Sequence, residues 1–313
     1  MALDPQVQAL LEAAARAGRT PVNKFPPVEA RVQFKELRKA LLPPTPSIGS
    51  VTDFSIAGRH GAIPLRHYRP IGTRTNHELP VLIYFHGGGW VVGDLETHDS
   101  LSRQLANAGE CAVISVDYRM GPEDKFPAAV DDAEDVVRYV AANATQLNTD
   151  SARIAIGGDS AGGNLSAVVA LLCRDSAGPA IKFQLLIYPA TDMEMGHPSH
   201  TLFAEGYNLT RDLMLYFRGH YLNDMAEIKD WRASPLYSKS LANLPPTYVI
   251  TAGFDPLRDE GKEFADKLAR AGVKVRYQCF DGMIHGFITM SGVLKVANEA
   301  IAECGKELRS HLS

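Results

Sequence analysis

One serine stands in a glycine-rich context that suits a nucleophile. Ser160 lies in the segment Gly158-Asp159-Ser160-Ala161-Gly162, which matches the pattern G-x-S-x-G. This pattern is typical of a sharp turn between a strand and a helix, where the glycines leave room and the serine hydroxyl projects outward. A chain of this size contains the pattern by chance about one time in ten, so Ser160 needs partners elsewhere in the sequence.

A histidine and an aspartate downstream of Ser160 supply those partners. A serine hydroxyl becomes an effective nucleophile only when a neighbouring base takes its proton. Asp255 and His285 follow Ser160 in the order that one class of catalytic triads has. We predict that His285 is the base and that Asp255 orients it. Asp259 is a weaker candidate, because its position beyond Pro256 is typical of a helix N-cap.

A second glycine-rich segment predicts a site for developing negative charge. The residues HGGGW at 86–90 directly follow an apolar run. Glycines allow backbone N–H groups to approach an oxyanion closely. We expect the N–H groups of Gly88, Gly89 and Ala161 to form an oxyanion hole, each contributing about 3 kcal/mol. A phosphate-binding loop is rejected because no dinucleotide or G-K-[ST] pattern is present, and His86 is expected to brace the loop.

Two aromatic residues beside these segments are candidates for the substrate pocket. Trp90 adjoins the predicted oxyanion hole, and Tyr188 ends an apolar run. Ordinary burial in the core is the alternative for both. The sequence contains neither H-E-x-x-H nor a cluster of cysteines and histidines, so we expect no metal and no cofactor.

Alternating strand and helix patterns place these residues in an α/β fold. Continuous apolar runs alternate with amphipathic segments, which predicts a mostly parallel sheet covered on both faces. The predicted strands are 52–56, 63–68, 81–85, 112–117, 152–156, 183–188, 247–251 and 273–280. The predicted helices are 101–108, 128–147, 162–174, 260–271 and 292–312. The predicted reactive residues follow strands, as expected at the carboxyl edge of such a sheet.

Two segments depart from this alternation. Residues 1–50 contain two predicted helices, and residues 191–235 are too long for an ordinary loop and rich in aromatic side chains. We expect both to form a helical cap over a catalytic domain made of residues 51–190 and 236–313.

Composition excludes several classes of protein. The net charge is −4 and the basic residues are scattered, which is unlike a nucleic-acid-binding surface. No run approaches the roughly 20 apolar residues of a membrane span, and the first residues do not resemble a signal peptide. The four cysteines are widely spaced. We therefore expect a cytoplasmic protein without a membrane anchor or a nucleic-acid partner.

Together, the motifs resemble the hormone-sensitive-lipase-like family, also called bacterial family IV. The matching segments are HGGGW at 86–90, GDSAGGN at 158–164, DPLRDEG at 255–261 and HGF at 285–287. The resemblance implies an α/β-hydrolase fold with an eight-stranded sheet and a cap. It also implies a carboxylesterase acting on small esters with short to medium acyl chains, and a possible homodimer through the strand at 273–280.

Two other functions remain open at this point. The same triad can hydrolyse an aryl formamide, an acetylated amine or a lactone, because a fold does not determine its substrate. Some plant hormone receptors resemble this family but lack the catalytic histidine and bind ligands without turnover. The presence of His285 argues against the receptor.

Overall fold

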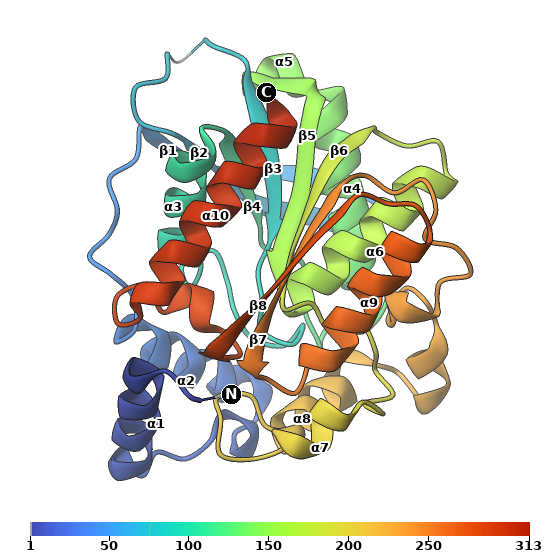
Figure 1. The fold of residues 1–313 in the computed structure, drawn as a ribbon. Helices are drawn as coiled ribbons and strands as arrows, with labels where there is room; N and C mark the ends of the chain where they lie inside the picture. The colour runs from blue at the N-terminus through green and yellow to red at the C-terminus, as the bar shows by residue number, and fades with distance from the viewer. Residues whose placement is uncertain (1, 75) are drawn as a thin grey trace.

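The computed structural model describes residues 2–74 and 76–313, which form an eight-stranded sheet flanked by helices (Figure 1). The strand order is β1-β2-β4-β3-β5-β6-β7-β8. β2 is antiparallel to both of its neighbours, and the other neighbouring strands are parallel. The strands are β1 (Ser50–Gly58), β2 (Gly61–Arg69), β3 (Leu79–Phe85), β4 (Ala112–Val116), β5 (Thr149–Asp159), β6 (Ile181–Ile187), β7 (Thr247–Phe254) and β8 (Val275–Ile284). The predicted mostly parallel sheet is confirmed.

The central strands are apolar on both faces because each face is covered. Successive side chains of a strand point to opposite sides of the sheet. In β3, Val81, Ile83 and Phe85 pack into one core cluster, whereas Leu82 and Tyr84 pack into the other. All five side chains are fully buried. This double burial explains why the strands read as continuous apolar runs rather than as alternating patterns.

Five helices cover the two faces of the sheet (Figure 1). Side chains of α4, α6 and α9 contribute to one core cluster, and side chains of α3 and α10 to the other. These helices are α3 (Asp99–Gly109), α4 (Ala128–Ala142), α6 (Ala161–Asp175), α9 (Arg258–Arg270) and α10 (Lys295–Leu312).

The two departing segments gather at the carboxyl edge of the parallel strands. Figure 1 shows their helices together below that edge. They are α1 (Pro5–Ala17), α2 (Pro27–Lys39), α7 (Pro198–Leu202) and α8 (Arg211–Tyr221). Ala30 and Phe34 of α2 pack with Phe217 of α8 against Val91 and Val92, which follow the predicted oxyanion loop. The helices thus enclose the region where the reactive residues were expected.

Most predicted boundaries shift by up to three residues, and two predicted elements end four or more residues from the expected position. The helix expected at 128–147 breaks at Asn143, whose side-chain amide donates to the Tyr139 carbonyl oxygen (2.9 Å) and ends α4. A short helix, α5 (Ala144–Leu147), follows. The strand expected at 273–280 begins at Val275 and extends to Ile284, because a register shift in the ladder lets Ile284 pair with Phe254.

No helix within residues 2–74 and 76–313 combines the length and the apolar character needed to cross a lipid bilayer.

Candidate active site

Ser160 occupies the turn between β5 and α6. Its backbone has φ 56° and ψ −115°, a strained conformation for a residue with a side chain. The flanking glycines make this turn possible, since a Cβ atom on either Gly158 or Gly162 would overlap the carbonyl oxygen of Phe85. The G-x-S-x-G pattern therefore reflects the close passage of three backbone segments beneath Ser160.

Ser160, His285 and Asp255 form one chain of hydrogen bonds. The His285 Nε2 atom lies 2.9 Å from Ser160 Oγ, and His285 Nδ1 lies 2.7 Å from Asp255 Oδ2. Asp255 is fully buried and His285 is 7% exposed. The other carboxylate oxygen of Asp255 accepts the Leu257 N–H (2.8 Å). The arrangement allows His285 to take a proton from Ser160 while Asp255 holds the ring in place.

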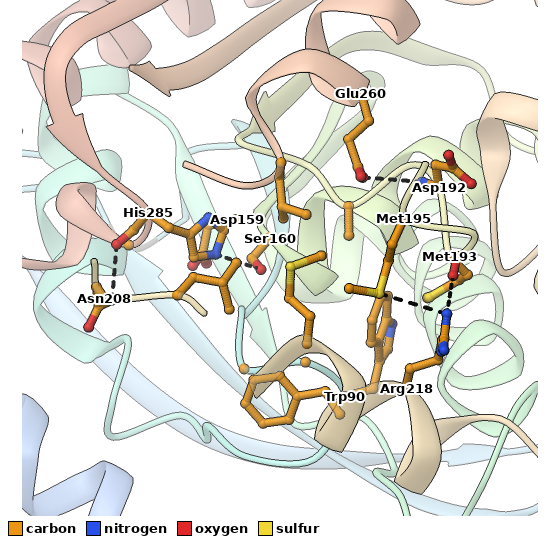
Figure 2. Close-up of a pocket in the computed structure, with 18 of the residues that line it drawn as sticks. Trp90, Asp159, Ser160, Asp192, Met193, Met195, Asn208, Arg218, Glu260 and His285 are labelled. Carbon is orange, nitrogen blue, oxygen red and sulfur yellow. Dashed lines mark hydrogen bonds between the residues drawn. The ribbon is translucent and has the colours of Figure 1, made fainter. Parts of the chain in front are cut away.

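Strand pairing explains why Asp255 and His285 meet. Phe254, the last residue of β7, pairs with Ile284, the last residue of β8. Asp255 and His285 each follow directly, so the two neighbouring parallel strands deliver them to the same edge. Asn208, from the segment 191–235, donates to the His285 carbonyl oxygen (3.0 Å; Figure 2).

The loop after β3 lies beside Ser160 and carries free backbone donors. Gly88 and Gly89 line the pocket with Ser160 and His285. Both have positive φ, 132° and 61°, and a Cβ atom on Gly89 would overlap the Phe217 ring. In the described part of the chain, no backbone carbonyl accepts a hydrogen bond from the N–H groups of Gly88, Gly89 or Ala161.

Asp159 connects this loop to the turn that contains Ser160. Its Oδ1 atom accepts the Gly87 N–H (2.9 Å) and the Tyr84 hydroxyl (2.8 Å), and it lies 3.3 Å from His98 Nε2. Burial alone would raise the pKa of Asp159, but His98 and the hydrogen bond from Tyr84 outweigh it and lower that pKa. The carboxylate therefore fixes the loop relative to Ser160.

His86 contacts and supports the same loop. Its ring stacks on Tyr118, with centroids 4.4 Å apart, and its Nδ1 atom lies 2.9 Å from the Gly87 carbonyl oxygen. Burial lowers the pKa of His86 to about 4, so the ring is neutral near pH 7. These contacts agree with the expected bracing role.

The pocket above Ser160 is narrow and mostly apolar. It encloses a cavity of about 90 Å³. Thioether and aromatic side chains from the loop after β3, α2 and the segment 191–235 form much of its wall: Phe34, Trp90, Met193, Met195, Met214 and Phe217. Figure 2 shows Ser160 and His285 at one side of this space and Met193 and Met195 at the other.

Of the two predicted pocket residues, the structure places only Trp90 in the pocket wall. Tyr188 is fully buried behind the base, with its ring centroid 4.6 Å from that of His285. The backbone explains the difference, since Tyr188 has φ 34° and its N–H donates to the Ile250 carbonyl oxygen (2.6 Å). The side chain therefore turns into the core and supports His285 instead of facing substrate.

A cluster that the sequence analysis missed lies next to the pocket. Ligand atoms of His197, His200 and Glu260 lie within 4.8 Å of one another, close enough for the three side chains to contact one metal ion. Hydrogen bonds account for this geometry, because His200 Nε2 lies 2.7 Å from Glu260 Oε2 and His200 Nδ1 accepts the His197 N–H (3.1 Å). His200 and Glu260 are both fully buried.

Known proteins resemble this chain along its whole length. A family profile described as the alpha/beta hydrolase fold matches residues 82–289. The carboxylic ester hydrolase LipN of Mycobacterium tuberculosis is 40% identical over 99% of this chain and 84% of its own length. The ethyl acetate hydrolase of Pseudomonas putida is 35% identical over 100% of both chains.

A solved structure gives the same picture. An ester-hydrolase from the metagenome of Lake Arreo, complexed with a derivative of bipyridine phosphonate, superimposes with a TM-score of 0.95 at 41% identity, covering 99% of both chains. The resemblance that the motifs predicted is confirmed: the chain belongs to the alpha/beta hydrolase fold family, in its hormone-sensitive-lipase-like group.

Proposed function

We propose that this protein is a serine esterase that hydrolyses carboxylic esters through an acyl-enzyme intermediate. The observation that carries the proposal is the hydrogen-bonded chain Ser160–His285–Asp255 beside free backbone donors at the pocket floor. The names of the relatives, a carboxylic ester hydrolase and an ethyl acetate hydrolase, support an ester as the substrate.

The geometry suggests the following sequence of steps. Ser160 Oγ attacks the ester carbonyl carbon while His285 Nε2 takes its proton, and the carbonyl oxygen receives hydrogen bonds from Gly88, Gly89 and Ala161. His285 then gives that proton to the departing alkoxide, which leaves as the alcohol. Water, deprotonated by His285, attacks the acyl-enzyme carbonyl, and the acid departs as Ser160 regains its proton.

The cover over the pocket supports short to medium acyl chains as substrates. We assign residues 1–50 and 191–235 to a cap over a catalytic domain of residues 51–190 and 236–313. Met193, Met195 and Met214 from this cap narrow the cavity to about 90 Å³. Flexible thioether side chains adapt to small changes in ligand shape, but this volume leaves little room for long chains.

The test is hydrolysis of p-nitrophenyl esters with acyl chains of two to twelve carbons. We expect the highest kcat/KM at short to medium chains and a loss of at least about 10⁴-fold in Ser160→Ala. The matched control is Ser151→Ala, an exposed serine on the same strand, β5, which should retain wild-type rates. Full activity in Ser160→Ala would refute the assignment of the nucleophile, and turnover of amides but not esters would favour the acetylated-amine alternative.

Two further features support proposals about location and assembly. We assign the protein to the cytoplasm, because its four cysteines are free thiols and three of them are buried. We also propose a homodimer that pairs through β8, because β8 is an edge strand and an open edge favours pairing. Light scattering should give twice the mass of one chain, and a monomer at all concentrations would exclude the dimer.

A further inference from the structure

Helix α2 carries four basic residues, of which Lys39 pairs with Glu36 (2.6 Å) and the other three differ in their partners. Arg31 pairs with Glu123 (2.5 Å) and Lys35 pairs with Asp94 (2.9 Å). Arg38, the third, lines the catalytic pocket. Its guanidinium lies over the ring of Phe34, 4.8 Å from the centroid, and it donates to Thr289 Oγ1. Within residues 2–74 and 76–313, no carboxylate forms an ion pair with Arg38.

The acidic residues of the pocket form hydrogen bonds or ion pairs with other groups and none forms an ion pair with Arg38 in the described part of the chain. Asp159 accepts hydrogen bonds from Tyr84 and the oxyanion loop, Glu260 pairs with His200, and Asp192 pairs with a histidine of the same segment. Burial lowers the pKa of the Arg38 guanidinium, and the nearby charge of Asp159 opposes this effect only in part. Arg38 is therefore a cation in the pocket wall that no carboxylate contacts directly within residues 2–74 and 76–313, and its charge is only partly offset by Asp159.

Arg38 lies on the side of the pocket where the alcohol part of an ester must lie. His285 has to protonate the departing alkoxide, so the alcohol portion lies next to His285. The Nη2 atom of Arg38 is 3.3 Å from the point where a Cβ atom of Gly286, the next residue, would stand. The other arginine of the pocket, Arg218, lies with Met193 beyond Ser160 (Figure 2).

We propose that Arg38 binds a carboxylate on the alcohol portion of the substrate, so that the preferred substrates are acyl esters of hydroxy acids. A guanidinium presents paired N–H donors that match the two oxygens of a carboxylate. The ester oxygen then lies beside His285 and the acyl group extends toward Met193 and Arg218. This inference rests on the proposed esterase activity and narrows its substrate class.

The experiment compares charged and uncharged esters of the same shape. Acetoxyacetate, 3-acetoxypropanoate and 4-acetoxybutanoate are each paired with the corresponding primary carboxamide, and acetate release is measured. The quantity of interest is the ratio of kcat/KM for the acid to that for its amide. Because both values come from one preparation, the ratio is independent of how much protein is folded.

We expect this ratio to exceed about fivefold in the wild-type enzyme for at least one spacer length, and to fall about tenfold in Arg38→Gln. Arg38→Lys keeps the charge but not the paired donors, and its ratio should lie between the two. Arg218→Gln is the matched control: it removes a positive charge from the side of the pocket beyond Ser160 and should leave the ratio within twofold.

Three results would overturn the inference: a wild-type ratio below one, an unchanged ratio in Arg38→Gln, or a loss of the ratio in Arg218→Gln instead. The second result would make Arg38 only an anchor of α2 on Thr289. Each of these results is compatible with a serine esterase. Failure of the proposed function itself would show separately, as no hydrolysis of p-nitrophenyl acetate by the wild-type enzyme.

Discussion

The two walls of the pocket differ in how their charged side chains are paired. At the strand ends, Asp255, Asp159 and His285 each bond to named partners. On the helical cover, Arg38 and Arg218 line the same cavity without an ion pair in the described part of the chain. Charged side chains held by several hydrogen bonds keep one geometry, as bond-making chemistry requires, whereas a cation without an ion pair is available for a ligand. We infer that the sheet determines the reaction and the cover determines the substrate.

After Ser160→Ala, replacing Asp255 should give the largest effect, because it removes a fully buried carboxylate that bonds His285. In Asp255→Asn the carboxamide cannot stabilise the imidazolium, and we expect kcat for p-nitrophenyl butyrate to fall about 10³–10⁴-fold. Asp281→Asn, an exposed aspartate on β8, is the control and should retain wild-type kcat. Comparable losses in both variants would refute a special role for Asp255.

Gly89 lies where the two walls touch, so Gly89→Ala tests their separation. The new methyl group would overlap Phe217 of α8 in a backbone with φ 61°. We expect kcat to fall about 10²-fold through displacement of one oxyanion donor. Adding Phe217→Ala should restore part of the loss. Gly219→Ala, where a Cβ atom meets nothing within 4 Å, should be harmless. An active Gly89→Ala enzyme would show that this loop does not hold the oxyanion.

Substitutions confined to the helical cover should alter the preferred acyl-chain length more than the rate of hydrolysis. Met214→Ala widens the cavity, so we expect the best p-nitrophenyl ester to lengthen by about two carbons, with kcat/KM for the acetate ester changing less than about fivefold. The neighbouring Leu215 is 38% exposed and does not line the pocket, so Leu215→Ala should leave the profile unchanged. A rate collapse in Met214→Ala without a shift in the profile would contradict the division between the walls.

His197, which lies behind the helical cover, should affect the free energy of unfolding rather than the rate of ester hydrolysis. Hydrogen bonding to Asp192, and then to Glu263, raises the pKa of His197 to about 9 against the opposing effect of burial. A raised folded-state pKa stabilises the protein fully below pH 6.5, and this contribution disappears as the pH rises to 9. Denaturant unfolding should therefore show a loss of about 1–2 kcal/mol over that range.

The variant His197→Gln should lose this part of the pH dependence. His60, half exposed at 52%, is the control, and His60→Gln should keep the wild-type slope. An identical slope in the wild-type protein and in His197→Gln would show that the ion pairs of His197 do not contribute to stability.

The pocket wall at the strand ends, which carries Ser160, Asp255 and His285, was predictable from sequence because its geometry depends on backbone patterns. The glycines beside Ser160, together with Gly88 and Gly89, are needed because other parts of the chain pass closely there. The apolar runs in the sequence place Asp255 and His285 directly after strands. The structure brings these predicted side chains together, while their chemical roles stay predictions. Tyr188 was harder to place, because its direction depends on a positive φ at the end of β6 that no residue type indicates.

For the helical cover, the sequence predicted which segment forms it but not which of its side chains face the pocket. Its length and aromatic content separate residues 191–235 from the α/β pattern, but no periodicity indicates which side chains face inward. Arg38 lies in the same amphipathic helix as Arg31 and Lys35. Only the tertiary contacts show that Arg38, unlike the other two, has no ion-pair partner in the described part of the chain. Likewise, Glu260 and His200 are 60 residues apart in sequence, so their buried pairing depends on how the cover folds back.

Covalent labelling of the nucleophile tests the central claim most directly. The enzyme is treated with a fluorophosphonate, digested, and analysed by mass spectrometry alongside residual esterase activity. We expect one adduct per chain, on the peptide containing Ser160, formed in proportion to the loss of activity and absent when Asp255→Asn is treated for the same short time. Complete inactivation with the adduct on another residue, or full modification of Ser160 without loss of activity, would contradict the account.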